Sequence, residues 1–527
     1  MKKLAKALSL LLVVAMVLSL AACGGGNTTP NNNSSNNNNV APAEPKILKI
    51  ATVKTINQAG FPSAAGTDQK VVATTVLESL GRYDDKGNIY GFLAKEIITK
   101  PEEPAIVLKL QEGVKFHDDT PFNAQAVCDV YDILKENGQA AQFANVESYS
   151  ATGEYEVTIK LKAWTTDAVE KLCIGCGQMF SPTAFKKNGI DWMYTHMVGT
   201  GAFIQKEFTI GDKIVCEKNP NYWQKGLPVI DGITIYQFDD ETAAMNALRT
   251  KDIRLIIYPN MQNYKTLLGE GFTRYGVDSC TGIAGVLGMF FASGKEGQDV
   301  TNLKVRQAIC YAVNKEGLAN AFTEGLGVVT EQLGVAGTRE NNPAVKGYPY
   351  NPAKAKELLK EAGFDENHPA EVTLTFTKAY EDIFTAVQKN LTDVGIKVNL
   401  DITDNIGDKI TMNGADPYVS ICWWSAPTMV SGWFRYYSAN PFTMVRDCLD
   451  LKAAGVIDLY DRIMTAKTPE EQKTLMDELA IKTVDELCLY CPFYHTLSYY
   501  IGDNSIINSD FGMRGNTQWT PETVDFK

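Results

Sequence analysis

The stretch NPAKAKELLKEAGFDENHPAEVTLTFTKAYEDIFTAVQKNLTDVGIKVNLDI, from Asn351 to Ile402, decides the fold of this chain. Asn351 is a favourable helix cap, Pro352 a favourable first helical residue, and Gly363 a favourable residue just past a helix end. Between them, apolar residues recur at the spacing of one helix face: Ala355, Leu358, Leu359 and Ala362. The pattern predicts a helix between Pro352 and Gly363.

Downstream of this helix the pattern changes three times. Residues 372–376 alternate between apolar and polar, helical spacing returns over 383–391 and closes at Gly395, and alternation resumes over 396–402. A strand, a helix and a strand within about thirty residues form a crossover unit, whose two strands pair in parallel. The segment therefore predicts an α/β domain.

The first half of the chain is richer in strand patterns. Alternation predicts strands over 47–53, 106–110 and 155–161. Residues 240–250 carry apolar residues at helical spacing and lead into an expected strand over 253–258. About 480 residues follow Pro45, which is more than one hydrophobic core usually holds. We therefore expect a mixed-sheet domain followed by a second α/β domain.

The amino-terminal segment has the pattern of an export signal. Three lysines precede an apolar run over 7–22, which ends in small residues before Cys23. The Leu-Ala-Ala-Cys ending resembles a bacterial lipobox, which predicts a lipoprotein signal peptide over 1–22 and lipidation of Cys23. The alternative is an ordinary secreted protein that carries a cysteine there. Residues 23–45 are rich in Asn, Gly and Ser, so we expect a disordered tether after the lipidated cysteine.

Charge and hydropathy narrow the possible partners. Without the three lysines of the leader, 47 of the 50 basic residues remain against 62 acidic ones, a formal charge of −15. This balance argues against nucleic-acid binding. No second apolar stretch is long enough to span a bilayer, so a lipid would be the only anchor. We expect localisation at the extracytoplasmic face of the bacterial cell membrane.

Two C-x-x-C pairs, Cys173/Cys176 and Cys488/Cys491, offer thiolates for a zinc site. They lie more than 300 residues apart, and the second pair sits in an apolar run. We favour small buried side chains over metal ligands or disulfides. His117, followed by Asp118 and Asp119, could also coordinate a metal, but a solvated turn explains these residues better.

Signatures of catalysis are missing from the sequence. It contains neither a G-x-S-x-G elbow nor an H-E-x-x-H helix, and residues 288–295 lack the spacing of a phosphate-binding loop. We expect a protein that is not an enzyme and needs no cofactor. The aromatic residues are more suggestive, since Trp423, Trp424 and Trp433 fall in a segment broken by proline and glycine. They either line a ligand cleft or fill a domain core.

Seven ordered motifs resemble those of one known family. They read VLESL at 76–80, LQEGVKFHDDTPFNAQAV at 110–127, VGTGAF at 198–203, NPNYW at 219–223, KVRQAI at 304–309, the helix at 351–364, and VGIKV at 394–398. Together they resemble the bacterial extracellular solute-binding proteins of the oligopeptide, dipeptide and nickel class. These are the receptor components of ATP-binding-cassette (ABC) importers.

The resemblance implies a two-lobed periplasmic-binding-protein-like fold (type II, Venus-flytrap) with mixed sheets and a hinge. Lobe I would take 46–278, lobe II 279–494, and the chain would return to lobe I over 495–527. A monomer would capture a peptide or other small polar solute between the lobes. It would deliver the solute to permease and ATPase subunits, without covalent chemistry.

Two departures from the family pattern concern the ligand. Peptide binders of the family carry an acid after the tryptophan, whereas Trp424 is followed by SAPTMVS. Arg254 stands where the family has an acid, which we interpret as a surface change. The expected ligand contacts are Trp423, Trp424 and Trp433 on the second lobe, with Gln69 and Lys70 on the first. The alternatives are a receptor for nickel or a metal chelate, and a cell-surface hydrolase.

Overall fold

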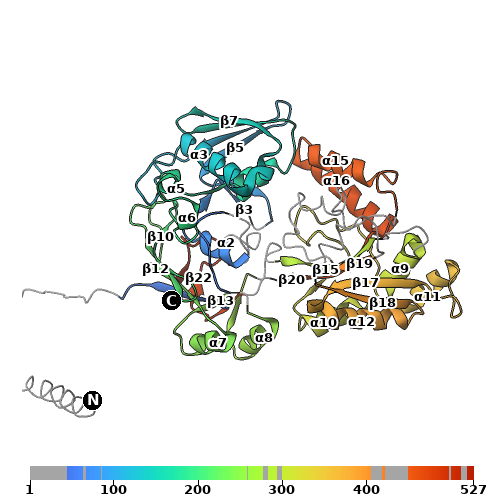
Figure 1. Cartoon of the computed structure of the whole chain (residues 1–527). Helices are drawn as coiled ribbons and strands as arrows, with labels where there is room; N and C mark the ends of the chain where they lie inside the picture. Colours follow the sequence, from blue (N-terminus) through green and yellow to red (C-terminus); the bar gives the residue numbers. More distant parts are fainter. Residues whose placement is uncertain are drawn as a thin grey trace, which may run out of the picture. The chain divides into compact units, whose positions relative to one another are not determined.

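The computed structural model describes residues 44–62, 67–84, 86–257, 259–276, 283–292, 299–404, 418–421, 449–497, 500–511 and 519–527. The chain divides into two units, Met1–Glu44 and Pro45–Lys527. Every described helix and strand belongs to the second unit (Figure 1). Among the residues that the structure describes, no helix combines the length and apolar character needed to cross a lipid bilayer.

A seven-stranded mixed sheet forms the base of the amino-terminal half. Its strands, in spatial order, are β10 (Phe203–Thr209), β11 (Lys213–Lys218), β12 (Gly232–Gln237), β1 (Ile47–Thr52), β13 (Leu255–Ile257), β21 (Tyr500–Gly502) and β14 (Thr273–Tyr275). β1 pairs in parallel with both β12 and β13, whereas β21 pairs antiparallel with β13 and β14. Strand β21, near the carboxy terminus, therefore belongs to the same sheet as β1, the first strand of the chain.

Successive residues of the central strand β1 point to opposite faces of this sheet, and each face is covered. Ile50 belongs to a large core shared with α2 (Thr67–Ala73) and α3 (Ala124–Leu134). The next residue, Ala51, belongs to a smaller core under α7 (Glu241–Arg249) and α8 (Met261–Gly269). The predicted helix over 240–250 is confirmed as α7, with Asp240 as its cap.

An antiparallel four-stranded sheet and several short elements complete this half. The sheet has the order β5 (Ala94–Lys100), β6 (Ala105–Leu110), β8 (Glu156–Leu161) and β7 (Val146–Gly153). The short strands are β2 (Glu78–Ser79), β3 (Gly81–Tyr83), β4 (Ile89–Gly91), β9 (Gln178–Met179), β22 (Ile506–Ile507) and β23 (Asp525–Phe526). The short helices are α4 (Ala168–Glu170), α5 (Pro182–Asn188) and α6 (Ile190–Met193).

A six-stranded mixed sheet organises the second half. Its order is β16 (Val328–Val329), β20 (Tyr490–Leu497), β15 (Ile283–Ala292), β19 (Tyr418–Ile421), β17 (Glu371–Thr377) and β18 (Lys397–Thr403). Its helices are α9 (Leu303–Ala312), α10 (Lys315–Phe322), α11 (Pro352–Glu361), α12 (Glu381–Thr392), α15 (Val456–Thr465) and α16 (Pro469–Ile481).

The predicted crossover unit is confirmed. β17 and β18 pair in parallel, with Val372 opposite Val398, and α12 connects them. The expected helix before them is α11, which is capped by the Asn351 side chain and carries Pro352 at its first position. Gly363 takes a positive φ of 91°, as a residue that ends a helix often does.

Three hydrophobic cores define two lobes, which we name by their residues. The first lobe is built on the cores that draw on residues 48–267 and 500–526, and the second lobe on the core that draws on 286–494. Strands β14 and β21 pair in the first lobe, while β15 and β20 pair in the second. The chain thus passes between the lobes twice, after β14 and after β20. The fold is α/β with mixed sheets, as predicted.

Candidate functional site

Most of the predicted ligand contacts lie outside the described residues. This holds for Trp423, Trp424 and Trp433, and for the expected lipidation site Cys23. Lys70 lies in α2, but its side chain is outside the described part of the chain.

Gln69 is the one predicted contact whose side chain can be placed. It is half-buried, and its Nε2 donates a hydrogen bond to Oδ1 of Asn57 at 2.9 Å. Asn57 lies in the segment between β1 and α2, so the pair fixes that segment against the helix. Side-chain amides offer both donors and acceptors, which suits recognition of a polar ligand.

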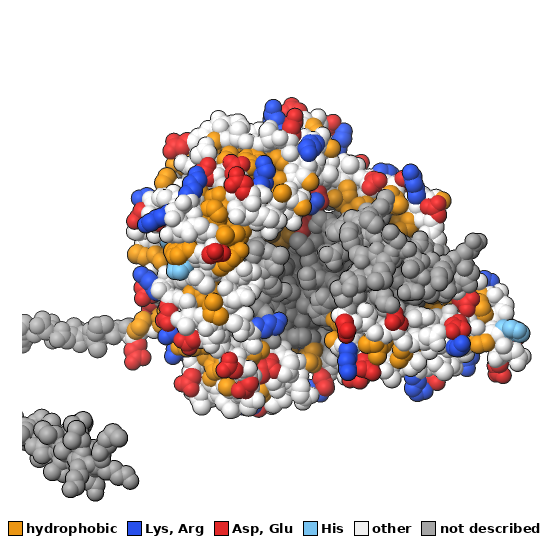
Figure 2. All heavy atoms as spheres, viewed as in Figure 1, with side chains coloured by type: hydrophobic (Ala, Val, Ile, Leu, Met, Phe, Trp, Pro, Cys, Tyr) orange, Lys and Arg blue, Asp and Glu red, His pale blue; other side chains and the backbone are white. Residues whose placement is uncertain are grey.

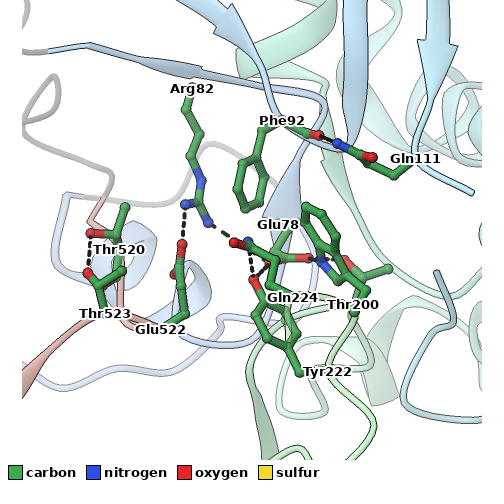
Figure 3. A network of polar contacts seen from close by, with 12 residues as sticks. Glu78, Arg82, Phe92, Gln111, Thr200, Tyr222, Gln224, Thr520, Glu522 and Thr523 are labelled. Atoms are coloured by element: carbon green, nitrogen blue, oxygen red, sulfur yellow. Dashed lines mark hydrogen bonds and ion pairs between the residues drawn. The ribbon is translucent and has the colours of Figure 1, made fainter. Parts of the chain in front are cut away.

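A buried polar network forms directly after α2, centred on Glu78 (Figure 3). The carboxylate of Glu78 accepts hydrogen bonds from the Thr200 hydroxyl at 2.8 Å, the Tyr222 hydroxyl at 2.6 Å and Trp223 Nε1 at 3.1 Å. Burial raises the pKa of Glu78 to about 7, although Arg82 and Tyr222 act to lower it. Such a network specifies one arrangement of its members because every polar atom left unpaired would be costly.

Arg82 connects this network to the end of the chain. Its NH1 group lies 2.6 Å from Oε1 of Glu522, and its NH2 lies 4.0 Å from Glu78. The guanidinium also stacks on the ring of Phe92, 3.4 Å from the ring centre. All three charged residues are buried. No local sequence pattern links residues 440 positions apart, so this contact could not be predicted.

Four motifs behind the family resemblance meet beside this network. Gly199 and Gly201 lie so close to the backbone of Val76 that a Cβ would fall 2.3 and 2.5 Å from its carbonyl oxygen. The Gly201 carbonyl in turn faces Nε2 of His117 at 2.9 Å and accepts from Asn219 Nδ2 at 3.1 Å. These residues thus hold the first lobe together below α2 rather than supplying ligand groups.

We predict that Gly201→Ala lowers the free energy of unfolding by about 2–3 kcal/mol, because backbone must move to admit the methyl group. The matched control is Gly269→Ala, since a Cβ there meets no atom within 4 Å. The control should be neutral or gain up to about 1 kcal/mol in helix propensity. Urea unfolding of both variants measures the difference, and equal midpoints would contradict the prediction.

The cysteine pairs do not form a common metal site. Cys173 and Cys176 belong to a first-lobe core, whereas Cys488 and Cys491 belong to the second-lobe core. All seven described cysteines are buried free thiols, so the favoured interpretation as small buried side chains is confirmed. Within the described ranges, no group of three or more His, Cys, Asp or Glu side chains could hold a metal ion.

The turn interpretation of the segment 117–119 is also supported. Asp119 takes a left-handed backbone conformation with a φ of 64°. Asp118 accepts from the Ser181 hydroxyl at 2.6 Å, while His117 is half-buried. Burial lowers the pKa of His117, which favours a neutral ring at pH 7.

Arg254, interpreted from the sequence as a surface change, has a structural role. Its NH1 donates to Asp503 Oδ2 and to the Ser505 hydroxyl, both at 2.8 Å, and its guanidinium lies 4.2 Å from the centre of the Phe526 ring. Only 30% of its side chain is exposed. Arg254 therefore fastens the returning carboxy-terminal segment to the first lobe, a contact that sequence spacing does not reveal.

Comparison with known proteins identifies a family with this architecture. A model of the bacterial extracellular solute-binding proteins, family 5 (middle), matches residues 88–444. The chain belongs to this family. The match covers the four-stranded sheet, the motif at 198–203, the first passage between the lobes and most of the second lobe.

Curated relatives include glutathione-binding proteins. GsiB of Shigella flexneri serotype 5b is 27% identical over 351 residues, which cover 65% of this chain and 66% of the relative. GsiB of Escherichia coli K12 is 26% identical over the same length. The chain therefore aligns with just under two thirds of the length of these relatives.

Solved structures of the same architecture cover the chain almost completely. NikA from Brucella suis in complex with Fe(III)-EDTA superposes with a TM-score of 0.77 at 20% identity, covering 91% of this chain and all of NikA. AppA from Bacillus subtilis in complex with a nonapeptide gives 0.65 at 20% identity, covering 90% and 99%. The unliganded open form of the murein tripeptide binding protein MppA gives 0.75 at 17% identity, covering 92% and 98%. The predicted two-lobed binding-protein fold is confirmed.

Proposed function

We propose that this protein is the substrate-binding receptor of an ABC importer. It captures a peptide or other small polar solute between its two lobes and delivers it to a membrane permease. The family match over residues 88–444 carries this proposal. Two lobes joined by two adjacent passages of the chain suit the role, because ligand contacts with both lobes favour a closed state over an open one.

We also propose how the receptor is held at its place of work. A signal over residues 1–22 directs export, Cys23 carries the lipid, and the segment to residue 45 acts as a tether at the extracytoplasmic face of the cell membrane. The chain changes lobes near residue 278 and again near residues 494–497, where β20 ends at Leu497, and the receptor acts as a monomer. Figure 2 shows acidic and basic side chains interspersed over the visible face, which suits a partner other than nucleic acid.

A metal chelate is the second candidate ligand. The structural neighbour NikA holds Fe(III)-EDTA. A chelated metal needs few or no protein ligands, so its recognition would rest on polar and aromatic groups facing the chelator. This candidate is compatible with described residues that include no metal-ligating cluster.

A thermal-shift screen tests the proposed function. The panel contains di- to nonapeptides, glutathione, free nickel, Fe(III)-EDTA and other chelates, amino acids and sugars. A ligand present at 100 times its dissociation constant should stabilise the protein by about 2.7 kcal/mol, which is seen as a raised melting temperature. Stabilisation by peptides supports the first proposal and by chelates the second. Recovery of a cleaved compound would contradict both.

Trp424 provides a prediction about the site itself. If its ring stacks on the ligand, Trp424→Ala weakens binding of the compound selected in the screen by about 1–3 kcal/mol while the melting temperature of the free protein is kept. Isothermal titration measures the affinity. The matched control is Trp192→Ala, whose ring stacks on His196 in the first lobe at 4.0 Å. An unchanged affinity in Trp424→Ala would remove Trp424 from the site.

A further inference from the structure

The two lobes touch at a place remote from the chain passages between them. The segment before α4 in the first lobe meets the end of α15 in the second. The Thr166 amide donates to the Met464 carbonyl at 2.7 Å, and Trp164 Nε1 donates to the Ala466 carbonyl at 2.9 Å. Figure 1 shows α15 and α16 beside the four-stranded sheet, while β20 and β13 lie lower in the view. This contact therefore joins the two lobes at the end of their boundary that lies away from the chain passages.

Buried charged residues from both lobes gather next to this contact. Glu170 in α4 is 7% exposed, and Glu340 in the second lobe is 2% exposed. The Tyr83 side chain, from β3, is buried close to the Glu170 carboxyl. Arg339 donates from Nε to Oε1 of Glu340 at 2.8 Å and lies close enough to Glu170 to stabilise its charge.

The cluster holds more carboxyl groups than nearby cations can neutralise. Asp167, 6% exposed, directly precedes the same short helix and pairs with the outward-facing Lys171 at 2.6 Å. Arg339 is left to serve both Glu170 and Glu340. The second oxygen of Glu340, Oε2, is buried without a hydrogen-bond partner within the described part of the structure. An unpaired buried carboxylate is costly, and a bound proton lowers that cost.

We propose that Tyr83, Glu170, Arg339 and Glu340 form an interlobe clasp, which stabilises the closed arrangement of the lobes and binds a proton on closing. The proposal rests on the proposed function, because it makes the clasp a determinant of the affinity of the site between the lobes. These four are positioning residues, since they act through the balance between the open and closed states.

The direction of the pH effect depends on the carboxyl groups. Burial raises the pKa of Glu170 to about 7, with Asp167 and Glu340 adding to the rise and Arg339 opposing it. Burial likewise raises the pKa of Glu340. Opening would expose Glu170 and return its pKa toward the ordinary value of 4.5. The closed state therefore holds the additional proton between about pH 4.5 and pH 7, and rising pH favours opening.

The other titratable groups that face Glu170 do not reverse this direction. The pKa values of Tyr83 and of Tyr460 in α15 are raised by burial, so both phenols stay neutral. Asp167 lies on the same helix as Glu170 in either state, so its repulsion is common to both. The groups that opening removes from Glu170 are Arg339 and Glu340.

Small-angle scattering of the ligand-free protein tests the clasp directly. Each unit by which opening lowers the Glu170 pKa is worth a factor of about ten in the ratio of closed to open molecules. We expect that ratio to fall at least about tenfold between about pH 5.5 and pH 8, with a larger radius of gyration. Glu170→Gln keeps the size of the side chain but cannot ionise, so the radius of gyration of this variant should stay small at both pH values.

Two further variants separate a clasp from general damage. Arg339→Met removes the cation, so this variant should open at pH 8 and close again at pH 5.5, a recovery that a merely misfolded protein would not show. Arg249→Met, which breaks an exposed pair with Glu270 inside the first lobe, should behave as the wild type does. A radius independent of pH in the wild type, or equal pH profiles for wild type and Glu170→Gln, would overturn the clasp. Either result leaves the proposed function to the ligand screen.

Discussion

Arg82→Met is expected to lower the free energy of unfolding by about 3–5 kcal/mol, the usual cost of removing one partner from a buried ion pair. The guanidinium stands between Glu522 at 2.6 Å and Glu78 at 4.0 Å, and all three side chains are buried. Methionine has a similar length and can still pack against Phe92, but it leaves two carboxyl groups without their cation. Chemical denaturation at pH 8 measures the loss.

We also expect the stability loss in Arg82→Met to depend on pH. Without Arg82, the pKa of Glu78 in the folded state rises further above that of the unfolded chain, because Arg82 acts to lower it. A carboxyl group whose pKa is raised by folding does not destabilise the protein at a pH where it is protonated in both the folded and the unfolded state. Its destabilising effect grows as pH rises through the folded-state pKa. The loss in Arg82→Met should therefore be smaller at pH 5 than at pH 8.

An exposed arginine in the same lobe provides the control. Arg249 forms a two-pronged ion pair with Glu270, at 2.7 and 2.8 Å, but both side chains are about one third exposed. Arg249→Met should cost much less than Arg82→Met, because solvent screens such pairs. If both variants lost the same amount, burial would not be the reason for the strength of the Arg82 contact.

The elements that the sequence predicts well are those whose signals are local. The helix from Pro352, the strands β17 and β18 and the helix between them each carry a cap, a period or a terminating glycine within a few residues. The parallel pairing is expected from the short crossover between the strands. Secondary structure and fold class in this region could therefore be derived without a structure.

Contacts between distant segments could not be predicted in this way. Glu78 bonds with the motifs at 198–203 and 219–223, and Arg82 with Glu522, through side chains more than 100 residues apart. Composition and periodicity carry no information on such pairs. The motif resemblance named the segments, but their role as a buried connection between parts of the first lobe appears only in three dimensions. The tryptophans expected to bind ligand stay a prediction.

Arg306 lies in one of the family-like motifs and has the other large predicted effect. It is 3% exposed in α9, and its guanidinium donates to four backbone carbonyl groups. NH1 reaches the carbonyls of Val300 and Thr301 at 2.9 Å, while Nε and NH2 reach those of Cys488 and Leu487 at 3.0 and 2.8 Å. One side chain thus joins the turn before α9 to the segment that leads into β20.

Arg306→Met is expected to lower the free energy of unfolding by about 4 kcal/mol, because it removes four charge-assisted N–H donors. Each buried carbonyl group that stays unpaired costs about 1–3 kcal/mol, and relaxation or the entry of water reduces the sum. Arg306→Lys should lose about half as much, since one ammonium has three donors but cannot span both segments. The control is Lys354→Met, which removes an exposed pair with Glu357 at 3.0 Å and should leave stability almost unchanged. Denaturant midpoints give the order of the three losses. Equal losses for Met and Lys at position 306 would contradict this order, and would mean that a retained positive charge contributes nothing without the fan of guanidinium donors.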